Sequence, residues 1–242
     1  NNIEIMIVNT RPRLLSDKLI ELSNNLNLEI LNAHLSEIVS LDLEQDFQSS
    51  AGYLNKISAY KNIIFTSQAS AEIGLRILQK NISIDLDILK IFSIGPATKQ
   101  ILLKKGMDSI SPNESSSRAL LELIQEKYPG RNLLFCGDNS NKFLQKNLNN
   151  IDEIICYKLK FNAQNIKKIT KNHKVILIYN FLTFDFIYKS VDPLFLDKKI
   201  LVTASKRIKN KIEMLVKNKD LQVFAAKEPT DKSMLDLAKS FI

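Results

Sequence analysis

Short apolar runs alternate along the chain with longer segments whose apolar residues recur at helical spacing. The runs predict strands at residues 3–8, 62–65, 90–94, 132–136, 174–179, 199–202 and 222–226. A polar or glycine-containing turn follows each run and leads into a predicted helix. Parallel sheets covered by helices on both faces produce this alternation, so the pattern predicts an α/β fold.

The pattern also contains a weak internal repeat. The segment "IIFTSQASAEIGL" (63–75) aligns with "LIYNFLTFDFIYK" (177–189) at an offset of 114 residues. The segment "SPNESSSRALLEL" (111–123) aligns with "AAKEPTDKSMLDL" (225–237) at the same offset. Equal offsets at two separate places favour two similar α/β domains.

Two strand–turn–helix units remain after this pairing, one at the start of the chain and one just before the second copy. If each domain takes one unit, domain one comprises residues 1–35 plus 161–242, and domain two, residues 42–153, is inserted into it. The chain then crosses between domains at residues 36–41 and 154–160, which are rich in strand-forming residues. A paired two-stranded linker of this kind would act as a hinge.

The formal net charge of +8 admits two classes of partner. A nucleic-acid-binding protein is one alternative, but the basic residues are dispersed and no stacking aromatics are interleaved with them. A basic field around a site for a small anion accounts for the same charge. We therefore expect an anionic small-molecule ligand and no nucleic acid.

Metal and membrane chemistry have little support in the sequence. Cys136 and Cys156 lie in apolar segments outside any cysteine cluster, and His34 and His173 are far apart. The apolar runs are much shorter than the roughly 20 residues that span a bilayer. The first residues lack the pattern of a secretory signal, so the expected location is the cytoplasm, with no membrane partner.

A set of short motifs occurs in a specific order: "NTRP", "IIFTSQASAE", "IFSIGPATKQILLKKG", "SSSRALLEL", "LLFCGDN" and "ICYKLKF". Each is only a strand, a turn and a helix start, but the ordered set resembles the uroporphyrinogen-III synthase family. The resemblance extends over nearly the whole chain and is strongest between residues 62 and 160. It implies two flavodoxin-like domains, each a parallel sheet flanked by helices, joined by a two-stranded linker.

The resemblance also implies the reaction. The linear tetrapyrrole hydroxymethylbilane would lose water and close to uroporphyrinogen III with its last pyrrole ring inverted, through a spiro intermediate. The family needs no cofactor and no metal, because the enzyme assists hydroxide departure and controls the geometry of closure. A monomer is expected, with possible transient handover of substrate from the preceding pathway enzyme.

Tyr157 in "IICYKLKF" matches the family's linker tyrosine, so the resemblance implies that it helps the hydroxyl leave. A phenol with a pKa of about 10 keeps its proton at neutral pH and can donate it. The competing interpretation is a strand tyrosine that packs between domains. The expected substrate-binding residues are Arg11, Thr66, Ser67, Gln68, Gly95, Thr98, Gly137 and Asp138.

Several of these residues have equally ordinary structural roles. Arg11 suits a substrate carboxylate or a salt bridge at the surface or between domains. Ser67 suits a helix cap with substrate contact beside it, so Ser67→Ala is expected to weaken binding more than chemistry. A substrate carboxylate could bind the N–H groups of the turn at Gly137 and Asp138.

The second copy departs from the family pattern. It has Asn180, Phe181, Lys206 and Arg207 where the family usually repeats its Thr-Ser and Gly-Pro-Thr turns, so those contacts are not transferred. The alternative function is a non-catalytic two-domain protein that binds a small anion, since a fold does not fix an activity.

Overall fold

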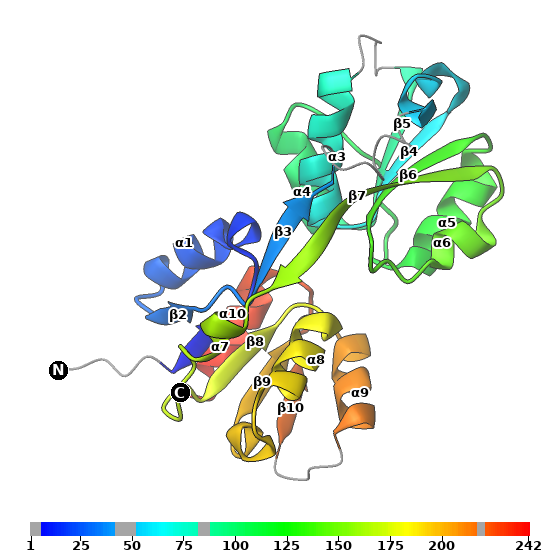
Figure 1. Cartoon of the computed structure of the whole chain (residues 1–242). Coiled ribbons are helices and arrows are strands. Elements are labelled where there is room, and N and C mark those ends of the chain that lie inside the picture. Colours follow the sequence, from blue (N-terminus) through cyan, green and yellow to red (C-terminus); the bar gives the residue numbers. More distant parts are fainter. Residues whose placement is uncertain (1–5, 42–51, 82–87, 217–220) are drawn as a thin grey trace. The chain divides into compact units, whose positions relative to one another are not determined.

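The computed structural model describes residues 6–41, 52–81, 88–216 and 221–242 (Figure 1). These residues divide into two compact units, unit 1 within residues 1–37 and 160–242 and unit 2 within residues 38–159. The chain leaves unit 1 within strand β3 (Ser36–Ser40) and returns to it within strand β7 (Ile151–Phe161).

Unit 2 is built on a five-stranded sheet with the order β3-β7-β6-β4-β5. Strands β4 (Asn62–Phe65), β5 (Lys90–Ser93), β6 (Asn132–Gly137) and β7 pair in parallel with their neighbours. Strand β3 lies beside β7 at the edge and runs against it, so this sheet is mixed (Figure 1).

Helices cover both faces of the unit 2 sheet, because successive strand side chains point to opposite faces. One core cluster joins alternate strand residues to helices α3 (Gln68–Asn81) and α4 (Pro96–Lys104). A second cluster joins the intervening strand residues to α5 (Ser117–Lys127) and α6 (Phe143–Asn147). The first cluster includes Ile63, Phe65, Leu133 and Phe135, and the second includes Ile64, Leu134 and Cys136.

Gly74 lets helix α3 approach the sheet closely. The Phe65 and Phe135 rings stack with centroids 5.2 Å apart. A Cβ on Gly74 would lie 2.7 Å from the Phe135 ring and 2.9 Å from the Phe65 ring. A glycine within a helix costs about 1 kcal/mol relative to alanine, and here it is required by the packing. The contact fixes α3, and with it the turn that precedes the helix.

Unit 1 contains a five-stranded sheet of order β10-β9-β8-β1-β2, in which neighbouring strands are parallel. Strand β1 (Ile7–Asn9) lies between β2 (Ile30–Asn32) and β8 (Val175–Ile178). Strands β9 (Ile200–Thr203) and β10 (Gln222–Ala225) complete the sheet. The first strand of the unit therefore pairs with one that follows the whole of unit 2 in sequence.

The helices of unit 1 enclose one core with this sheet. Helices α1 and α10 pack against each other, and α8 packs against both α7 and α9. The bounds are α1 (Asp17–Asn25), α7 (Ala163–Ile166), α8 (Phe181–Ser190), α9 (Lys206–Leu215) and α10 (Asp231–Lys239). Short 3₁₀ helices cover Arg13–Leu15, Ile57–Ala59 and Pro193–Leu196.

The α/β fold expected from the sequence is confirmed. The apolar runs from residue 62 onward each form a strand within a residue or so of the expected bounds. Residues 3–5 of the first run lie outside the described residues, and β1 begins at Ile7. The sheet of unit 2 is parallel over β4, β5, β6 and β7, and it is mixed because β3, which the sequence assigned to the linker, runs against β7.

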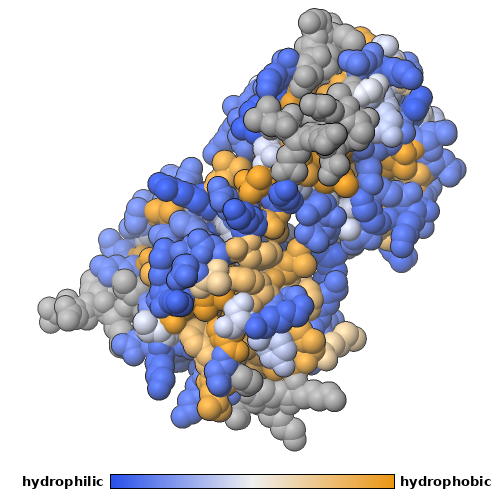
Figure 2. All heavy atoms as spheres, viewed as in Figure 1, coloured by the Kyte–Doolittle hydropathy of each residue, from blue (hydrophilic) through white to orange (hydrophobic). Residues whose placement is uncertain are grey.

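Hydrophilic residues cover most of the surface in view on each unit, with smaller hydrophobic areas between them (Figure 2). Charged residues make up 25% of the chain, which accounts for this surface. Within the described ranges, no helix combines the length and the apolar character needed to cross a bilayer.

Candidate active site at the carboxyl edge of unit 2

The sheet order of unit 2 brings most of the predicted site residues to one edge. Strands β4, β5 and β6 are parallel and adjacent, so the turns that follow them lie at the same edge. Tyr157 of β7 joins them, because Gly137 at the end of β6 is its partner in the register. In open α/β sheets, ligands bind outside the carboxyl ends of the strands, so this edge is the candidate site.

Tyr157 is a titratable group at this edge. Its hydroxyl oxygen lies 3.1 Å from the Ser67 Oγ, at hydrogen-bond distance. The ring is partly buried, and burial raises the pKa of Tyr157 to about 12, against the lowering effect of the Ser67 hydrogen bond. The phenol therefore keeps its proton throughout the physiological pH range and is a proton donor, not a base.

Gly137 provides the surface on which the Tyr157 ring rests. A Cβ at Gly137 would lie 2.6 Å from Cζ of Tyr157 and 2.9 Å from its hydroxyl oxygen. Since those atoms form the far end of a side chain, a methyl group there would displace the ring. Glycine at this position thus sets where the phenol lies.

We expect Gly137→Ala to lower kcat about tenfold, because a shift of the order of 1 Å in a reacting group is costly to catalysis. The fold should persist, since the ring can move without moving the strand. The matched control is Gly52→Ala, where a Cβ meets no atom within 4 Å. Steady-state kinetics with circular dichroism as a folding check would compare the variants, and unchanged kcat in Gly137→Ala would contradict this role.

The turn between β4 and α3 is closed by Ser67 and Ser70. Ser70 donates its N–H to Ser67 Oγ, and Ser67 donates its N–H to Ser70 Oγ, each at 3.0 Å. This reciprocal pair satisfies N–H groups that helix geometry leaves unpaired. Thr66 makes only a long bond from its hydroxyl to the Phe135 carbonyl (3.4 Å), and both Thr66 and Gln68 are partly exposed.

The two predicted substrate-binding residues that follow β5, Gly95 and Thr98, differ in where they lie. Gly95 lies at the edge, and a Cβ there would collide with the Ser115 hydroxyl. Gly95 also precedes α4, which begins with Pro96 and has no side-chain cap. The side chain of Thr98 is only 3% exposed, so the structure does not present it at the edge as a substrate contact.

Asp138 is exposed, but its N–H is occupied. It donates to the Tyr157 carbonyl at 3.0 Å, and the Asp138 carboxylate accepts from the Asn139 amide at 2.8 Å. The N–H of Ser140 donates to Gly137 O. The Asp138 N–H is therefore not available to a substrate carboxylate, since its bond holds the start of the loop against β7.

Arg11 belongs to a buried cluster in unit 1. Its guanidinium pairs with Asp231 at 2.5 Å, and both side chains are nearly inaccessible, at 5% and 8% exposed. The Tyr179 hydroxyl donates to the same Asp231 oxygen at 2.9 Å, and the Arg11 guanidinium lies over the Tyr179 ring. Arg11 therefore forms a salt bridge, but the pair is buried within unit 1 and is neither at the surface nor between domains, as the alternative had expected.

Sequence reasoning missed Ser70, Tyr179 and Asp231. The spacing Ser67-x-x-Ser70 is a signal for a reciprocal helix cap and could have identified Ser70.

The two copies of the repeat are offset by 113 residues at strands β4 and β8, and not by the 114 residues expected from the sequence, because β4 starts at Asn62 and β8 at Val175. Asn180 is thus the counterpart of Ser67, and it caps α8 by accepting from the Thr183 N–H at 2.8 Å.

The other residues singled out in the second copy have structural or surface roles. The Phe181 ring packs near Phe184, with ring centroids 6.2 Å apart. Lys206 and Arg207 are exposed in the first turn of α9, which Ser205 caps.

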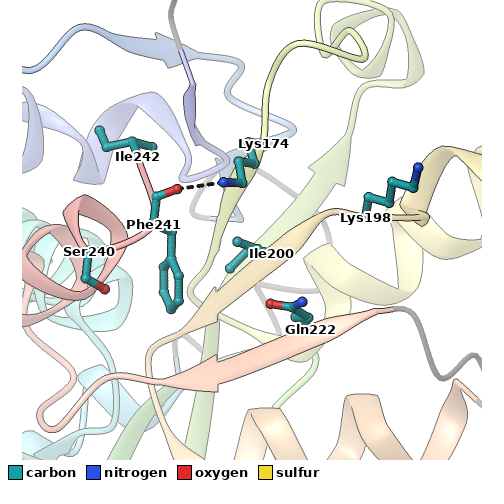
Figure 3. Close-up of a pocket in the computed structure, with 7 residues that line it drawn as sticks. All are labelled: Lys174, Lys198, Ile200, Gln222, Ser240, Phe241 and Ile242. Atoms are coloured by element: carbon teal, nitrogen blue, oxygen red, sulfur yellow. Dashed lines mark hydrogen bonds between the residues drawn. The ribbon is translucent and has the colours of Figure 1, made fainter.

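A cavity of about 880 Å³ lies elsewhere, at the amino ends of β8, β9 and β10 in unit 1 (Figure 3). Lys174, Lys198, Gln222 and Phe241 are among its lining residues, and Lys174 donates to the Phe241 carbonyl at 2.9 Å. Its lysines are exposed, and the predicted site residues do not line it. The carboxyl edge of unit 2 remains the candidate active site.

Cys136 and Cys156 are free thiols, and burial raises the pKa of Cys136 to about 12. They lie in different core clusters, on opposite faces of the sheet. Among the residues with described positions, histidine, cysteine and carboxylate side chains form no group of three that could hold a metal ion.

Comparison with known families matches residues 18–236 to the family described as Uroporphyrinogen-III synthase HemD. The fold is similar to a mutant Uroporphyrinogen III Synthase from the extremely thermophilic bacterium Thermus thermophilus, at 12% identity over 98% of both chains and a TM-score of 0.64. It is also similar to uroporphyrinogen-III synthetase from Helicobacter pylori, at 12% identity over 98% of this chain and 100% of that one, with a TM-score of 0.61.

No curated protein sequence gives a significant match. At 12% identity the structural likenesses show the fold alone, while the family model spans most of the chain. The chain belongs to the uroporphyrinogen-III synthase family.

Proposed function

We propose that this protein closes hydroxymethylbilane to uroporphyrinogen III, with loss of water and inversion of the last pyrrole ring, and that Tyr157 is its catalytic residue. Family membership supports the reaction. The observation that supports the residue is the position of its hydroxyl, 3.1 Å from Ser67 Oγ at the carboxyl edge of parallel strands, and burial, which raises the pKa of Tyr157 to about 12, keeps the phenol protonated.

Tyr157 would act as a general acid. The C–O bond of the hydroxymethyl group breaks, its electron pair leaves with the oxygen, and the Tyr157 proton converts the departing hydroxide to water. The pyrrole nitrogen supplies electrons to the carbon left behind. After ring closure, the proton released from the attacked ring restores the phenol, so the sum of the steps is loss of one water.

The rest of the edge would orient the substrate. Thr66 and Gln68 are partly exposed beside Ser67 and are the proposed contacts, whereas Gly95 is buried and the Ser115 hydroxyl occupies the space that a Cβ there would take. Orientation matters here because uncatalysed closure gives the other isomer. The edge therefore needs to hold a flexible chain in one geometry, and it needs no strong nucleophile.

The architecture we propose is two flavodoxin-like domains with a two-stranded linker. The sheet order of unit 1, read as β2-β1-β8-β9-β10, matches the doubly wound order 2-1-3-4-5. In unit 2, an isolated parallel bridge between Phe92 and Ile110 extends β7-β6-β4-β5 beyond β5, which supports the same arrangement in a circularly permuted form, since β6 and β7 come last in this unit. Residues 36–41 and 154–160 are the proposed linker, at the places where the chain changes unit.

The experiment that tests the function is an isomer assay. Freshly prepared hydroxymethylbilane is incubated with the protein, the products are oxidised, and the type I and type III isomers are separated by chromatography. We expect type III to dominate in the presence of enzyme. Type I alone, at the rate of the buffer blank, would reject the proposal in favour of a non-catalytic anion-binding protein.

Two further expectations remain open to direct measurement. The protein should be a monomer, which size-exclusion chromatography with light scattering would establish. Its location in the cytoplasm remains a prediction from the sequence.

A further inference from the structure

The Ser67 hydroxyl connects the start of helix α3 to the proposed catalytic phenol. Its oxygen accepts the Ser70 N–H at 3.0 Å and lies 3.1 Å from the Tyr157 hydroxyl oxygen. Ser70 is fully buried, and its own hydroxyl donates to the Ser67 carbonyl at 2.9 Å. Ser67 is thus fixed from the helix side, with its hydroxyl facing Tyr157.

The hydrogens in this cluster can be assigned by counting. A serine hydroxyl has one proton to donate and two lone pairs to accept with. The Ser70 N–H occupies one lone pair of Ser67 Oγ, and the proton of Ser70 is used at the Ser67 carbonyl. The remaining choice is the direction of the bond between Ser67 and Tyr157, since either hydroxyl can donate.

That direction determines whether Tyr157 can act as an acid. If Tyr157 donates to Ser67, the hydroxyl proton of Tyr157 is engaged in that hydrogen bond and does not face the substrate. If Ser67 donates to Tyr157, the phenol proton is free for the substrate. The phenolate formed on proton transfer then keeps the Ser67 hydrogen bond, which strengthens as negative charge develops on the acceptor.

We propose that Ser67 is a positioning residue that donates its hydroxyl proton to the Tyr157 oxygen, directs the phenol proton outward and stabilises the phenolate. This inference rests on the proposed role of Tyr157 and replaces direct substrate contact as the role of the Ser67 hydroxyl.

The start of helix α3 favours this direction. The helix runs from Gln68 to Asn81, and the Ser70 N–H in its first turn is at the positive end of the helix dipole. A hydroxyl that accepts from such an N–H becomes a better donor through its own proton. The positive end of α3 therefore acts on the Tyr157 oxygen through Ser67.

Unit 1 shows that capping alone does not require a hydroxyl here. Its counterpart of Ser67 is Asn180, whose side-chain oxygen accepts from both the N–H and the hydroxyl of Thr183. Asparagine and serine are comparable helix caps. A serine in unit 2 is thus explained by its second partner, Tyr157, and not by the helix.

The test uses Ser67→Ala, Ser67→Thr and Ser67→Asp in the full chain. Alanine removes the donor, threonine keeps it, and aspartate keeps the helix cap but can only accept. We expect Ser67→Ala to lower kcat roughly three- to tenfold with KM within about twofold, as loss of one neutral hydrogen bond implies. Threonine should restore kcat, and aspartate should not.

A spectroscopic measurement reports on the bond without turnover. The C–O stretching band of Tyr157, identified as the isotope-edited infrared band that Tyr157→Phe removes, distinguishes a phenol oxygen that accepts from one that only donates. We expect the same band position in wild type and Ser67→Thr, and a shift in Ser67→Ala and Ser67→Asp. If Ser67→Ala fails to fold, Ser67→Asp provides the same comparison, because it also lacks the hydroxyl donor.

Three results would overturn the inference: a raised KM with unchanged kcat in Ser67→Ala, equal losses of kcat in the alanine and threonine variants, or full activity in Ser67→Asp. The first would make Ser67 a substrate ligand, and the others would make it only a packing or capping residue. The infrared result stands apart from the isomer assay, so a failure of the proposed function is distinguishable from a failure of this inference.

Discussion

Tyr157→Phe is expected to lower kcat for hydroxymethylbilane by roughly 10²-fold, and by at least about tenfold, with the fold intact. The substitution removes only the oxygen that lies 3.1 Å from Ser67 Oγ. The ring keeps its place against Gly137, so packing and the sheet should persist. General acids contribute about 10²- to 10⁴-fold to the reactions that they assist, and an azafulvene-forming substrate lies at the lower end because it ionises readily.

The pH dependence of kcat provides a second test of the role of Tyr157. Burial raises the pKa of Tyr157 to about 12, so the phenol holds its proton throughout the neutral and mildly alkaline range. Loss of this proton should therefore not lower kcat even near pH 10, where an exposed tyrosine is about half ionised. A fall in kcat near neutral pH would have to come from another group.

The control for Tyr157→Phe is Tyr128→Phe. Tyr128 belongs to the same unit, and its ring packs edge-on against Phe92 with centroids 5.1 Å apart. This variant removes a phenol oxygen from unit 2 without altering the candidate site, and its kcat should match that of the wild type. Single-turnover measurements with separation of the isomers would compare the two. Near-normal formation of type III product by Tyr157→Phe would exclude Tyr157 as the acid.

Asp231→Ala is expected to destabilise unit 1 by about 3 to 5 kcal/mol. The Arg11 guanidinium is 5% exposed and meets the Asp231 carboxylate at 2.5 Å, and the Tyr179 hydroxyl donates to the same carboxylate oxygen. Removal of the carboxylate leaves a buried positive charge without this counter-ion and a buried hydroxyl without this acceptor. Desolvation of both groups is then uncompensated, which is costly in a protein interior.

Urea unfolding would measure the loss, with hydrogen exchange at β1 and β8 to assign it to unit 1. Asp185→Ala is the matched control, because Asp185 pairs with Lys189 across one helical turn and the lysine is 70% exposed. Such a surface pair contributes less than about 1 kcal/mol. A comparable loss of stability in both variants would show that the buried Arg11–Asp231 pair stabilises the protein no more than the exposed Asp185–Lys189 pair.

Several strands of this fold could be predicted well from sequence because they are fully buried. All four residues of β4, β8 and β9 are buried, and each strand contains at least three consecutive apolar residues. Strand β2 was missed because it has only three residues, all partly exposed at the sheet edge. A short edge strand has no period by which to recognise it.

The candidate site could be predicted only in part. Turns at the carboxyl ends of predicted parallel strands were the right place to look, and Ser67, Gly137 and Tyr157 do come together there. The bond between Ser67 and Tyr157 spans 90 residues of sequence, so local patterns hold no information about it. The Arg11 side chain was open to two interpretations because its partner, Asp231, lies 220 residues away.

The register of β1 has a consequence for how the chain is made. Ile7 pairs with Val175, so β1 cannot pair with β8 until the intervening residues, which include all of unit 2, have left the ribosome. Unit 2 is continuous in sequence and can fold while β1 still waits for β8. Its folding brings β3 and β7 together, which reduces the loop between β1 and β8 to the short stretches outside those two strands. The inserted unit therefore lowers the entropic cost of closing the unit that surrounds it.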